Sequence, residues 1–122
     1  MFKTMIVAGF GGFIGTCCRF LMNKAFPITP YQFPLSTFLV NIIGCFIFGI
    51  IIGYFERYKL VSPSLYAMII TGFCGGLTTF STFSYELNNL IVRSEFLIFS
   101  LYLILSILLG LFFLWIGLNL FR

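Results

Sequence analysis

The sequence predicts an all-α integral membrane protein, a single domain of four transmembrane helices over residues 1–122. Of these residues 61% are hydrophobic and only 8% are charged, whereas soluble domains carry about 25% charged residues. A soluble fold this short leaves too much surface exposed to bury so many apolar side chains. Four stretches also reach the length of about 20 mostly apolar residues that a spanning helix needs. They are Met5 to Met22, Leu35 to Phe55, Leu65 to Leu90, and Phe96 to Phe121.

The first span is apolar apart from Arg19 near its end. Gly11 and Gly15 are four residues apart, so they share a helix face and permit close approach of another helix. Arg19 has two structural interpretations. Its guanidinium reaches the membrane interface, which physics alone favours, or it caps carbonyl groups that a neighbouring helix leaves free.

The second span has no charged residue, but it carries Asn41 in its middle and Thr37 one turn earlier on the same face. A polar side chain inside the membrane is costly, so its presence indicates a function or a partner. The Asn41 amide both donates and accepts hydrogen bonds. Taken alone, it is better explained by an interhelical hydrogen bond than by a binding site.

The third span contains three glycines and five hydroxyl residues between residues 72 and 84. Both residue classes are poor helix formers, so we expect the third helix to break here. Irregular backbone at membrane depth survives only where protein or a water-filled site satisfies it. Freed carbonyls suit a small cation, and freed amides suit an anion. The alternative is an unbroken helix with a glycine-rich packing face.

Aromatic and polar side chains after this segment suggest a path for an anion. Phe80 and Phe83 share a helix face, and the edges of aromatic rings carry positive potential. In a chain with 18 phenylalanines, however, some lie near any site by chance. Glu86 follows about two turns after Phe80, and Tyr102 and Ser106 are four residues apart on the last span. A hydroxyl-lined path and ordinary interhelical hydrogen bonding both account for these three residues.

The charge pattern excludes several functions. The net charge is +4, but the basic residues form no patch, so no nucleic-acid partner is expected. With no histidine and no paired carboxylates, no enzyme is expected either. The residues that set membrane orientation divide four against three, which is compatible with insertion in both orientations. Lys3, Arg57, Lys59 and Arg122 lie on one side, and Arg19, Lys24 and Arg93 lie on the other.

Three segments together resemble the CrcB/Fluc family of fluoride channels. They are residues 11–15 followed by Arg19, residues 36–44, and residues 72–86. The third is highly specific, and the likeness extends over the whole chain. The resemblance implies a channel subunit in the bacterial cell membrane that exports fluoride passively and so reduces its toxicity. It also implies an antiparallel, dual-topology dimer in the lipid bilayer, formed with a second copy or with a paralogue.

The resemblance further implies roles for individual residues. A structural sodium ion at the dimer centre would be bound by the backbone carbonyls of Gly75 and Thr78. Relatives continue their polar track with hydroxyls one and two turns after Ser106, where this chain has Gly110 and Leu114. The fluoride pathway would comprise Asn41, Phe80, Phe83, Ser81, Thr82, Tyr102, Ser106 and, near the exit, Glu86.

Two other classes of membrane protein fit parts of the pattern. A small multidrug or guanidinium exporter also has four spans and dual topology, but it needs an acidic residue in the first helix, where this chain has Arg19. A non-conducting accessory subunit would explain the glycine faces but not the motif at residues 72–86.

Overall fold

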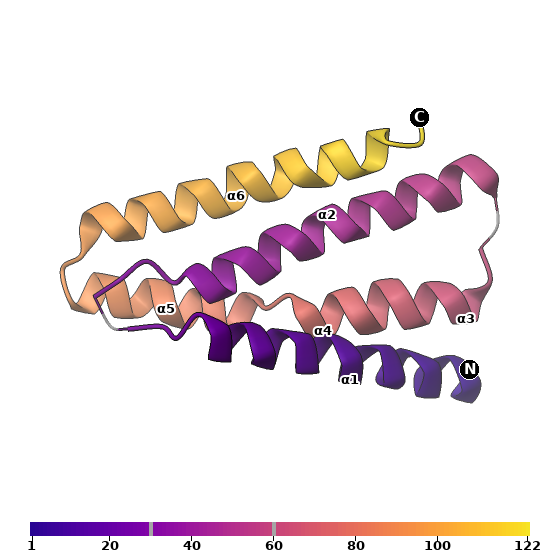
Figure 1. The fold of residues 1–122 in the computed structure, drawn as a ribbon, viewed down its shortest axis with the longest axis horizontal. Coiled ribbons are helices and arrows are strands. Elements are labelled where there is room, and N and C mark those ends of the chain that lie inside the picture. The colour runs from indigo at the N-terminus through magenta and orange to yellow at the C-terminus, as the bar shows by residue number, and fades with distance from the viewer. Residues whose placement is uncertain (30, 60) are drawn as a thin grey trace.

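The computed structural model describes residues 1–29, 31–59 and 61–122, and it is helical along four spans (Figure 1). All four helices are long and apolar enough to cross a membrane, which confirms the predicted number of spans. Pro30, which lies in the loop between the first two spans, is outside the described residues. The first, second and fourth spans are α1 (Phe2–Ala25), α2 (Leu35–Tyr58) and α6 (Phe96–Asn119).

The third span is divided into several helical segments. It starts with α3 (Pro63–Tyr66), which Ser62 caps by accepting a hydrogen bond from the Leu65 amide at 3.1 Å. Next come the π-helix η1 (Ala67–Cys74), α4 (Gly75–Leu77) and α5 (Phe80–Val92). The sequence did not predict the π-helix. Thr78 and Thr79 have extended backbone and form what we call the α4–α5 junction. Beyond it, α5 continues in nearly the same direction (Figure 1).

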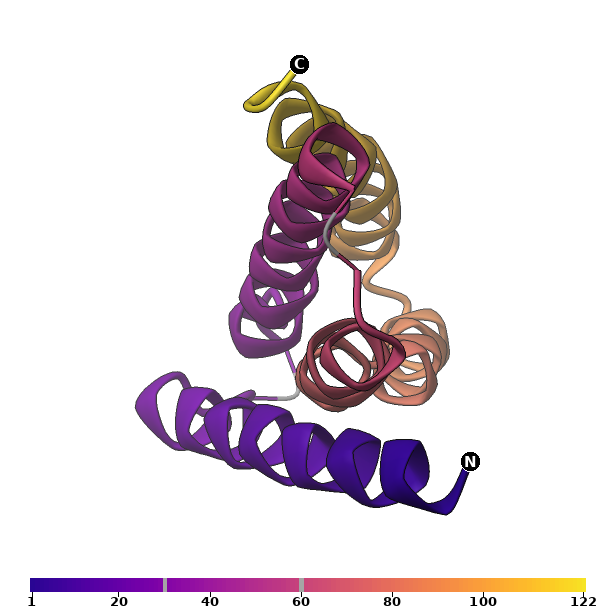
Figure 2. The ribbon, with the colours of Figure 1, turned by 90° about the vertical axis from the view of Figure 1, so that its right-hand side faces the viewer.

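The spans pack as two pairs, with α1 against η1 and α4, and α2 against α6 (Figure 2). Glycines make both contacts close. A Cβ atom added to Gly11 would lie 2.0 Å from the carbonyl oxygen of Met68, and one added to Gly49 would lie 2.4 Å from that of Leu114. The predicted role of Gly11 in helix packing is therefore confirmed, and Gly49 has the same role, because any larger residue would push the helices apart.

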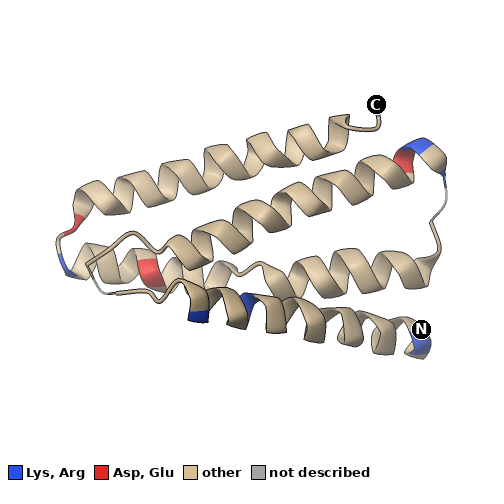
Figure 3. Cartoon of the chain, viewed as in Figure 1, with Lys and Arg blue, Asp and Glu red and all other residues tan. Residues whose placement is uncertain are grey.

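Both chain termini lie at the same end of the bundle (Figure 1). At that end Arg57 donates a hydrogen bond to the Phe121 carbonyl at 2.6 Å, and Arg122 forms an exposed ion pair with Glu56 at 2.9 Å. Charged residues gather at the two ends of the bundle (Figure 3). Between the ends the spans are mainly apolar, and Arg19 on α1 and Glu86 on α5 are charged exceptions.

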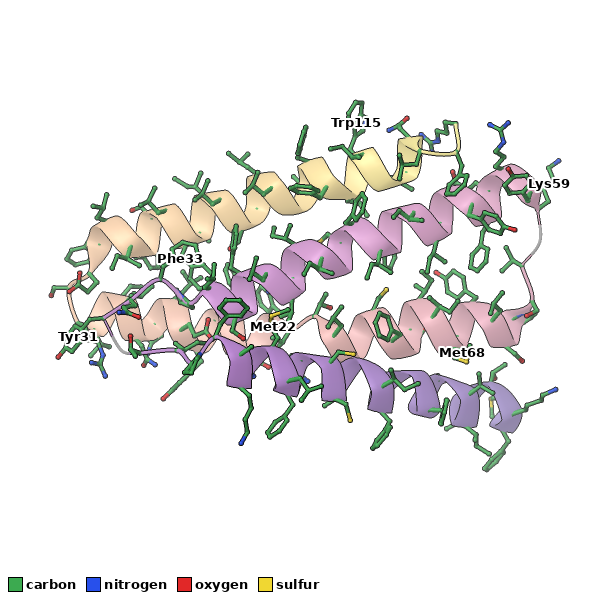
Figure 4. All side chains as sticks on the ribbon, in the orientation of Figure 1. Met22, Tyr31, Phe33, Lys59, Met68 and Trp115 are labelled. Atoms are coloured by element: carbon green, nitrogen blue, oxygen red, sulfur yellow. The ribbon has the colours of Figure 1, made fainter. Side chains whose placement is uncertain are left out.

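The outer surface is apolar, as lipid contact requires. Large hydrophobic side chains on every span are exposed; Trp115 on α6 is 61% exposed and points away from the bundle (Figure 4). The most deeply buried side chains include three that carry hydroxyl groups, Ser36, Thr37 and Tyr102, at 0%, 1% and 0% exposure. The chain is therefore a multi-pass membrane protein with polar groups in its interior.

Candidate functional site

The α4–α5 junction is held by the side chain of Asn41 on α2. The Asn41 Oδ1 atom accepts a hydrogen bond from the Thr79 amide at 2.8 Å, and its Nδ2 atom donates to the Thr79 carbonyl at 3.2 Å. One side chain thus satisfies both backbone groups of a residue that lies outside the helical pattern. The sequence favoured an interhelical hydrogen bond for Asn41, and the structure confirms that contact and identifies its partner.

Carbonyls next to the junction lose their α-helical donors. In a continuous α-helix the Thr79 amide would bond to Gly75, but it donates to Asn41 instead. The Thr82 amide would bond to Thr78, but it donates to the Thr79 hydroxyl at 3.3 Å. The carbonyls of Gly75 and Thr78 are therefore among the backbone groups of the third span that lose their α-helical donors at this junction, and those of Gly76 and Leu77 lose theirs as well.

Arg19 is hydrogen-bonded to a third carbonyl near the junction. Its Nε atom donates to the carbonyl of Gly76 at 2.9 Å, from a half-buried position on α1. Of the two interpretations of Arg19, the structure shows the contact that the second one predicts, the capping of a carbonyl of a neighbouring helix. The guanidinium can cap the carbonyl because the glycine packing of α1 against η1 and α4 brings it within reach.

An open groove of about 500 Å³ runs beside the junction, between α2, the third span and α6. Gly75 borders it, and a Cβ atom added to Gly75 would meet nothing within 4 Å. Leu114, one of the two positions at which this chain departs from the polar track implied by the resemblance, supplies an apolar part of the wall. The lining residues are Asn41, Gly44, Cys45, Phe48, Tyr66, Ile70, Thr71, Cys74, Gly75, Thr78 and Leu114.

A second polar cluster surrounds Glu86 on α5. The hydroxyl of Thr37 donates to Glu86 Oε1 at 2.6 Å, and the hydroxyl of Tyr102 donates to Oε2 at 2.7 Å. All three side chains are buried, with Glu86 only 7% exposed. Each carboxylate oxygen thus receives one hydroxyl hydrogen, from α2 and α6 respectively. The structure joins Glu86 to Tyr102 by an interhelical hydrogen bond, one of the two interpretations that the sequence left open, and adds Thr37, which sequence analysis had only placed on the face of Asn41.

Aromatic rings extend from this cluster. The ring of Phe83 meets that of Tyr102 edge to face, with centroids 5.0 Å apart, and Phe80 is tilted against Phe83 at 6.1 Å. Phe80 is 79% exposed within the single subunit. Phe33 also packs against Tyr102, at 5.2 Å. The sequence missed Phe33 because it lies in a loop and has no helical neighbour to mark its direction.

The remaining predicted hydroxyl groups separate into two environments. Ser81 and Thr82 lie at the start of α5, where their hydroxyls are 3.4 and 3.2 Å from the Thr79 hydroxyl. The Ser106 hydroxyl oxygen on α6 is buried and has no hydrogen-bond partner among the described residues. Gly110, one turn later, lies against Cys45. Ser106 is therefore not hydrogen-bonded to either polar cluster, and its hydroxyl group can bind another partner.

This arrangement offers hydroxyl and amide donors together with aromatic edges, and these are groups that bind a small anion without a strong fixed charge. In the described part of the chain, no three His, Cys, Asp or Glu side chains are grouped to hold a metal ion. The backbone carbonyls of Gly75 and Thr78 are oxygen ligands of the kind that a hard cation prefers.

Comparison with known proteins gives one consistent result. The family model described as "CrcB-like protein, Camphor Resistance (CrcB)" matches residues 6–118. A fluoride-specific ion channel FluC of Campylobacter jejuni is 44% identical, and the alignment covers all of both chains. One from Chlorobium phaeobacteroides is 40% identical over 98% of this chain and 93% of its own. One from Geotalea daltonii is 44% identical over 94% of each chain.

Proposed function

Because the chain belongs to the CrcB-like family, we propose that it is a subunit of a fluoride-selective ion channel in the bacterial cell membrane. The observation that carries the proposal is the full-length similarity to relatives named fluoride-specific ion channels, which describes a channel and not an enzyme. The proposed activity is passive export of fluoride from the cytoplasm, which lowers its toxicity.

The proposed assembly is an antiparallel homodimer. Four helices are too few to enclose an ion path, and the groove beside the junction is open in the single subunit. A second copy would cover this groove and the exposed ring of Phe80. The nearly balanced basic residues at the two ends of the bundle support insertion in both orientations. A heterodimer with a paralogue is the other assembly that the family admits.

The α4–α5 junction is proposed as the functional break of the third span, although the span changes direction little there. Its released carbonyls, Gly75 and Thr78, border the groove that the second subunit would cover. We propose that four such oxygens, two from each subunit, hold a structural sodium ion at the dimer centre. The open space beside Gly75 fits this role, because nothing in its own subunit obstructs an approaching ion or chain.

The proposed fluoride pathway follows the aromatic and hydroxyl groups. The edges of Phe80 and Phe83 replace part of the hydration shell without binding the ion strongly. The hydroxyls of Thr37 and Tyr102 then rotate from Glu86 toward the anion. When no ion is present, they donate their hydrogen bonds to Glu86 instead. The free hydroxyl of Ser106 is the next donor, and Gly110 and Leu114 make the path beyond it less polar.

Fluoride flux from liposomes that contain only this purified chain tests the proposal. We expect rapid fluoride efflux and strong rejection of chloride, because a narrow path lined by hydroxyls and ring edges cannot replace the hydration shell of the larger ion equally well. Empty liposomes are the control. Equal passage of chloride and fluoride would contradict a fluoride-selective channel.

A further inference from the structure

A small cavity of about 40 Å³ lies beyond Glu86, at the end of the bundle opposite the chain termini. It is bounded by the loop between α1 and α2 and by the last turns of α5. The proposed pathway does not yet include most of its lining residues. They are Ile28, Thr29, Gln32, Pro34, Glu86, Asn89 and Leu90.

The polar residues that line this cavity differ in burial: Glu86 is buried, Asn89 is half-buried and Gln32 is exposed. Glu86 lies at the buried end, where its two oxygens already accept hydrogen bonds from Thr37 and Tyr102. The amide side chains of Gln32 and Asn89 lie nearer the end of the bundle, on the loop and on the last turns of α5. An ion that reached the Glu86 cluster would therefore next encounter amide N–H groups.

The positively charged side chain of Arg93 does not line this cavity but lies close to residues that do. Asn89 and Arg93 are four residues apart, so they lie on the same side of the end of α5. The Arg93 guanidinium lies 4.9 Å from the ring centroid of Tyr31, the residue before Gln32. The loop and α5 are thus connected by a cation–aromatic contact just outside the two amides.

We propose that this cavity is the surface mouth of the ion pathway, with Asn89 and Gln32 as its fluoride-binding residues and Arg93 as the charge that attracts the anion. The inference rests on the proposed function. A cavity of this size holds only a few water molecules, and fluoride is close to water in size. Amide N–H groups replace water around the ion, and because they carry no net charge they also release it.

Groups of both charge signs lie around the cavity. Glu86 supplies a carboxyl group at its buried end, where Thr37 and Tyr102 donate to it, whereas Arg93 lies nearer the outer end and has no carboxylate within ion-pair distance among the described residues. A positive charge there raises the local concentration of anions, and this effect weakens as salt screens the charge. Salt dependence is therefore a property that separates an ion mouth from a structural loop contact.

Fluoride flux through liposomes reconstituted with the full chain tests the mouth. Asn89→Leu and Gln32→Met keep the approximate side-chain size but remove the N–H donors. We expect each to lower fluoride flux about tenfold, the usual effect of one lost hydrogen bond to an ion. The neighbouring and exposed Asn88→Leu is the matched control, and we expect it to conduct like the unmodified chain.

Arg93→Gln provides the second measurement. We expect about a threefold or greater loss of flux at low ionic strength, which disappears at high ionic strength. Asn89→Asp keeps the side-chain shape but adds negative charge, so it should show the same salt-dependent loss of fluoride flux. It replaces Asn89→Leu in the test if Asn89→Leu does not elute as the unmodified chain does in size-exclusion chromatography.

The outcomes separate this inference from the proposed function. If the unmodified chain and Asn88→Leu conduct fluoride while the Asn89 and Gln32 variants conduct equally well, the mouth lies elsewhere and the channel assignment remains. A loss of flux in Arg93→Gln that is the same at all ionic strengths would overturn the role of the Arg93 charge. If the unmodified chain conducts no fluoride, the proposed function fails, and this inference fails with it.

Discussion

Asn41 shows how one side chain makes an irregular backbone stable within a membrane. Extended residues in a transmembrane span leave an N–H and a C=O group without helical partners, and water is not available to replace them. Asn41 supplies an acceptor and a donor with the spacing of a backbone peptide, and Thr79 uses both. The role of Asn41 that the structure shows is therefore to shape the junction.

We predict that Asn41→Leu destabilises the protein by about 1–3 kcal/mol for each backbone group of Thr79 left unpaired, and that it abolishes fluoride flux. Thermal unfolding in detergent and liposome flux measure the two effects. Asn119→Leu is the control, because the Asn119 amide also donates to a backbone carbonyl, but at the exposed end of α6. Normal stability of Asn41→Leu would show that the junction does not depend on this side chain.

The two phenylalanines should respond differently to substitution. Phe83 packs against Tyr102, whereas Phe80 is largely exposed in the subunit. We predict that Phe83→Ile lowers both flux and thermal stability, and that Phe80→Ile lowers flux alone, because an aliphatic side chain has no electropositive edge. Phe10→Ile, at an exposed position of α1, controls for the loss of a ring. Unchanged flux in both variants would assign the rings to packing.

Sequence analysis located the polar residues but not their partners. It identified Glu86 and Tyr102 because charged and hydroxyl groups are conspicuous within apolar spans. It did not connect Thr37 to Glu86, since the two are 49 positions apart and the relative rotation of their helices is not readable from the sequence. For the same reason the sequence did not identify the partner of Arg19, since that contact depends on a glycine carbonyl of another helix.

At the level of elements, close packing of α1 on the third span positions the junction. Gly11 and Gly15 lie against carbonyls of η1, and Gly72 and Gly76 lie against carbonyls of α1, so both backbones contribute. This approach brings Arg19 to the Gly76 carbonyl. The number of spans followed from apolar length, whereas the π-helix did not, since hydrophobic patterning does not distinguish an i→i+5 from an i→i+4 ladder.

We predict that Gly11→Ala destabilises the fold by about 1–3 kcal/mol, as added volume in a packed interface usually does. The added Cβ atom would meet the Met68 carbonyl at 2.0 Å, and a backbone group cannot move aside as a flexible side chain can. Gly9→Ala is the matched control on the same helix, where the added atom meets nothing within 4 Å. Equal thermal stability of the two variants would contradict this packing.

At the level of the whole molecule, the two ends of the bundle carry similar basic charge, so neither end is strongly retained on the cytoplasmic side. We predict that the chain inserts in both orientations. Single cysteines introduced into the 26–34 loop and near Lys59, in a chain whose own four cysteines are replaced by serine or alanine, should each be labelled partly from both sides of the membrane. Labelling of each loop from one side only would exclude an antiparallel homodimer.

Substitution of Gly75 tests whether a second subunit covers the groove beside this residue. Within its own chain an added Cβ atom meets nothing within 4 Å, and alanine favours helix more than glycine does. We predict that Gly75→Ala leaves the unfolding temperature of the monomer unchanged but weakens the dimer, because the atom projects into the groove that the second subunit is proposed to cover. Gly9→Ala again serves as the control. A dimer unaffected by Gly75→Ala would place the subunit contact elsewhere.

The last prediction concerns the proposed sodium ion and follows from the same geometry. The junction removes the α-helical donors of the Gly75 and Thr78 carbonyls in each subunit, and a dimer would bring four such oxygens together without any carboxylate. Such a set suits a monovalent cation, since calcium takes six to eight oxygens and usually includes carboxylates.

A ligand that binds only the assembled state stabilises it by about 2.7 kcal/mol at a concentration 100 times its dissociation constant. Replacing sodium by a large organic cation should therefore lower the dimer's unfolding temperature, and returning sodium should restore it. Gly75→Ala should reduce this sodium response while Gly9→Ala keeps it, and a dimer equally stable in both salts would remove the ion from the centre.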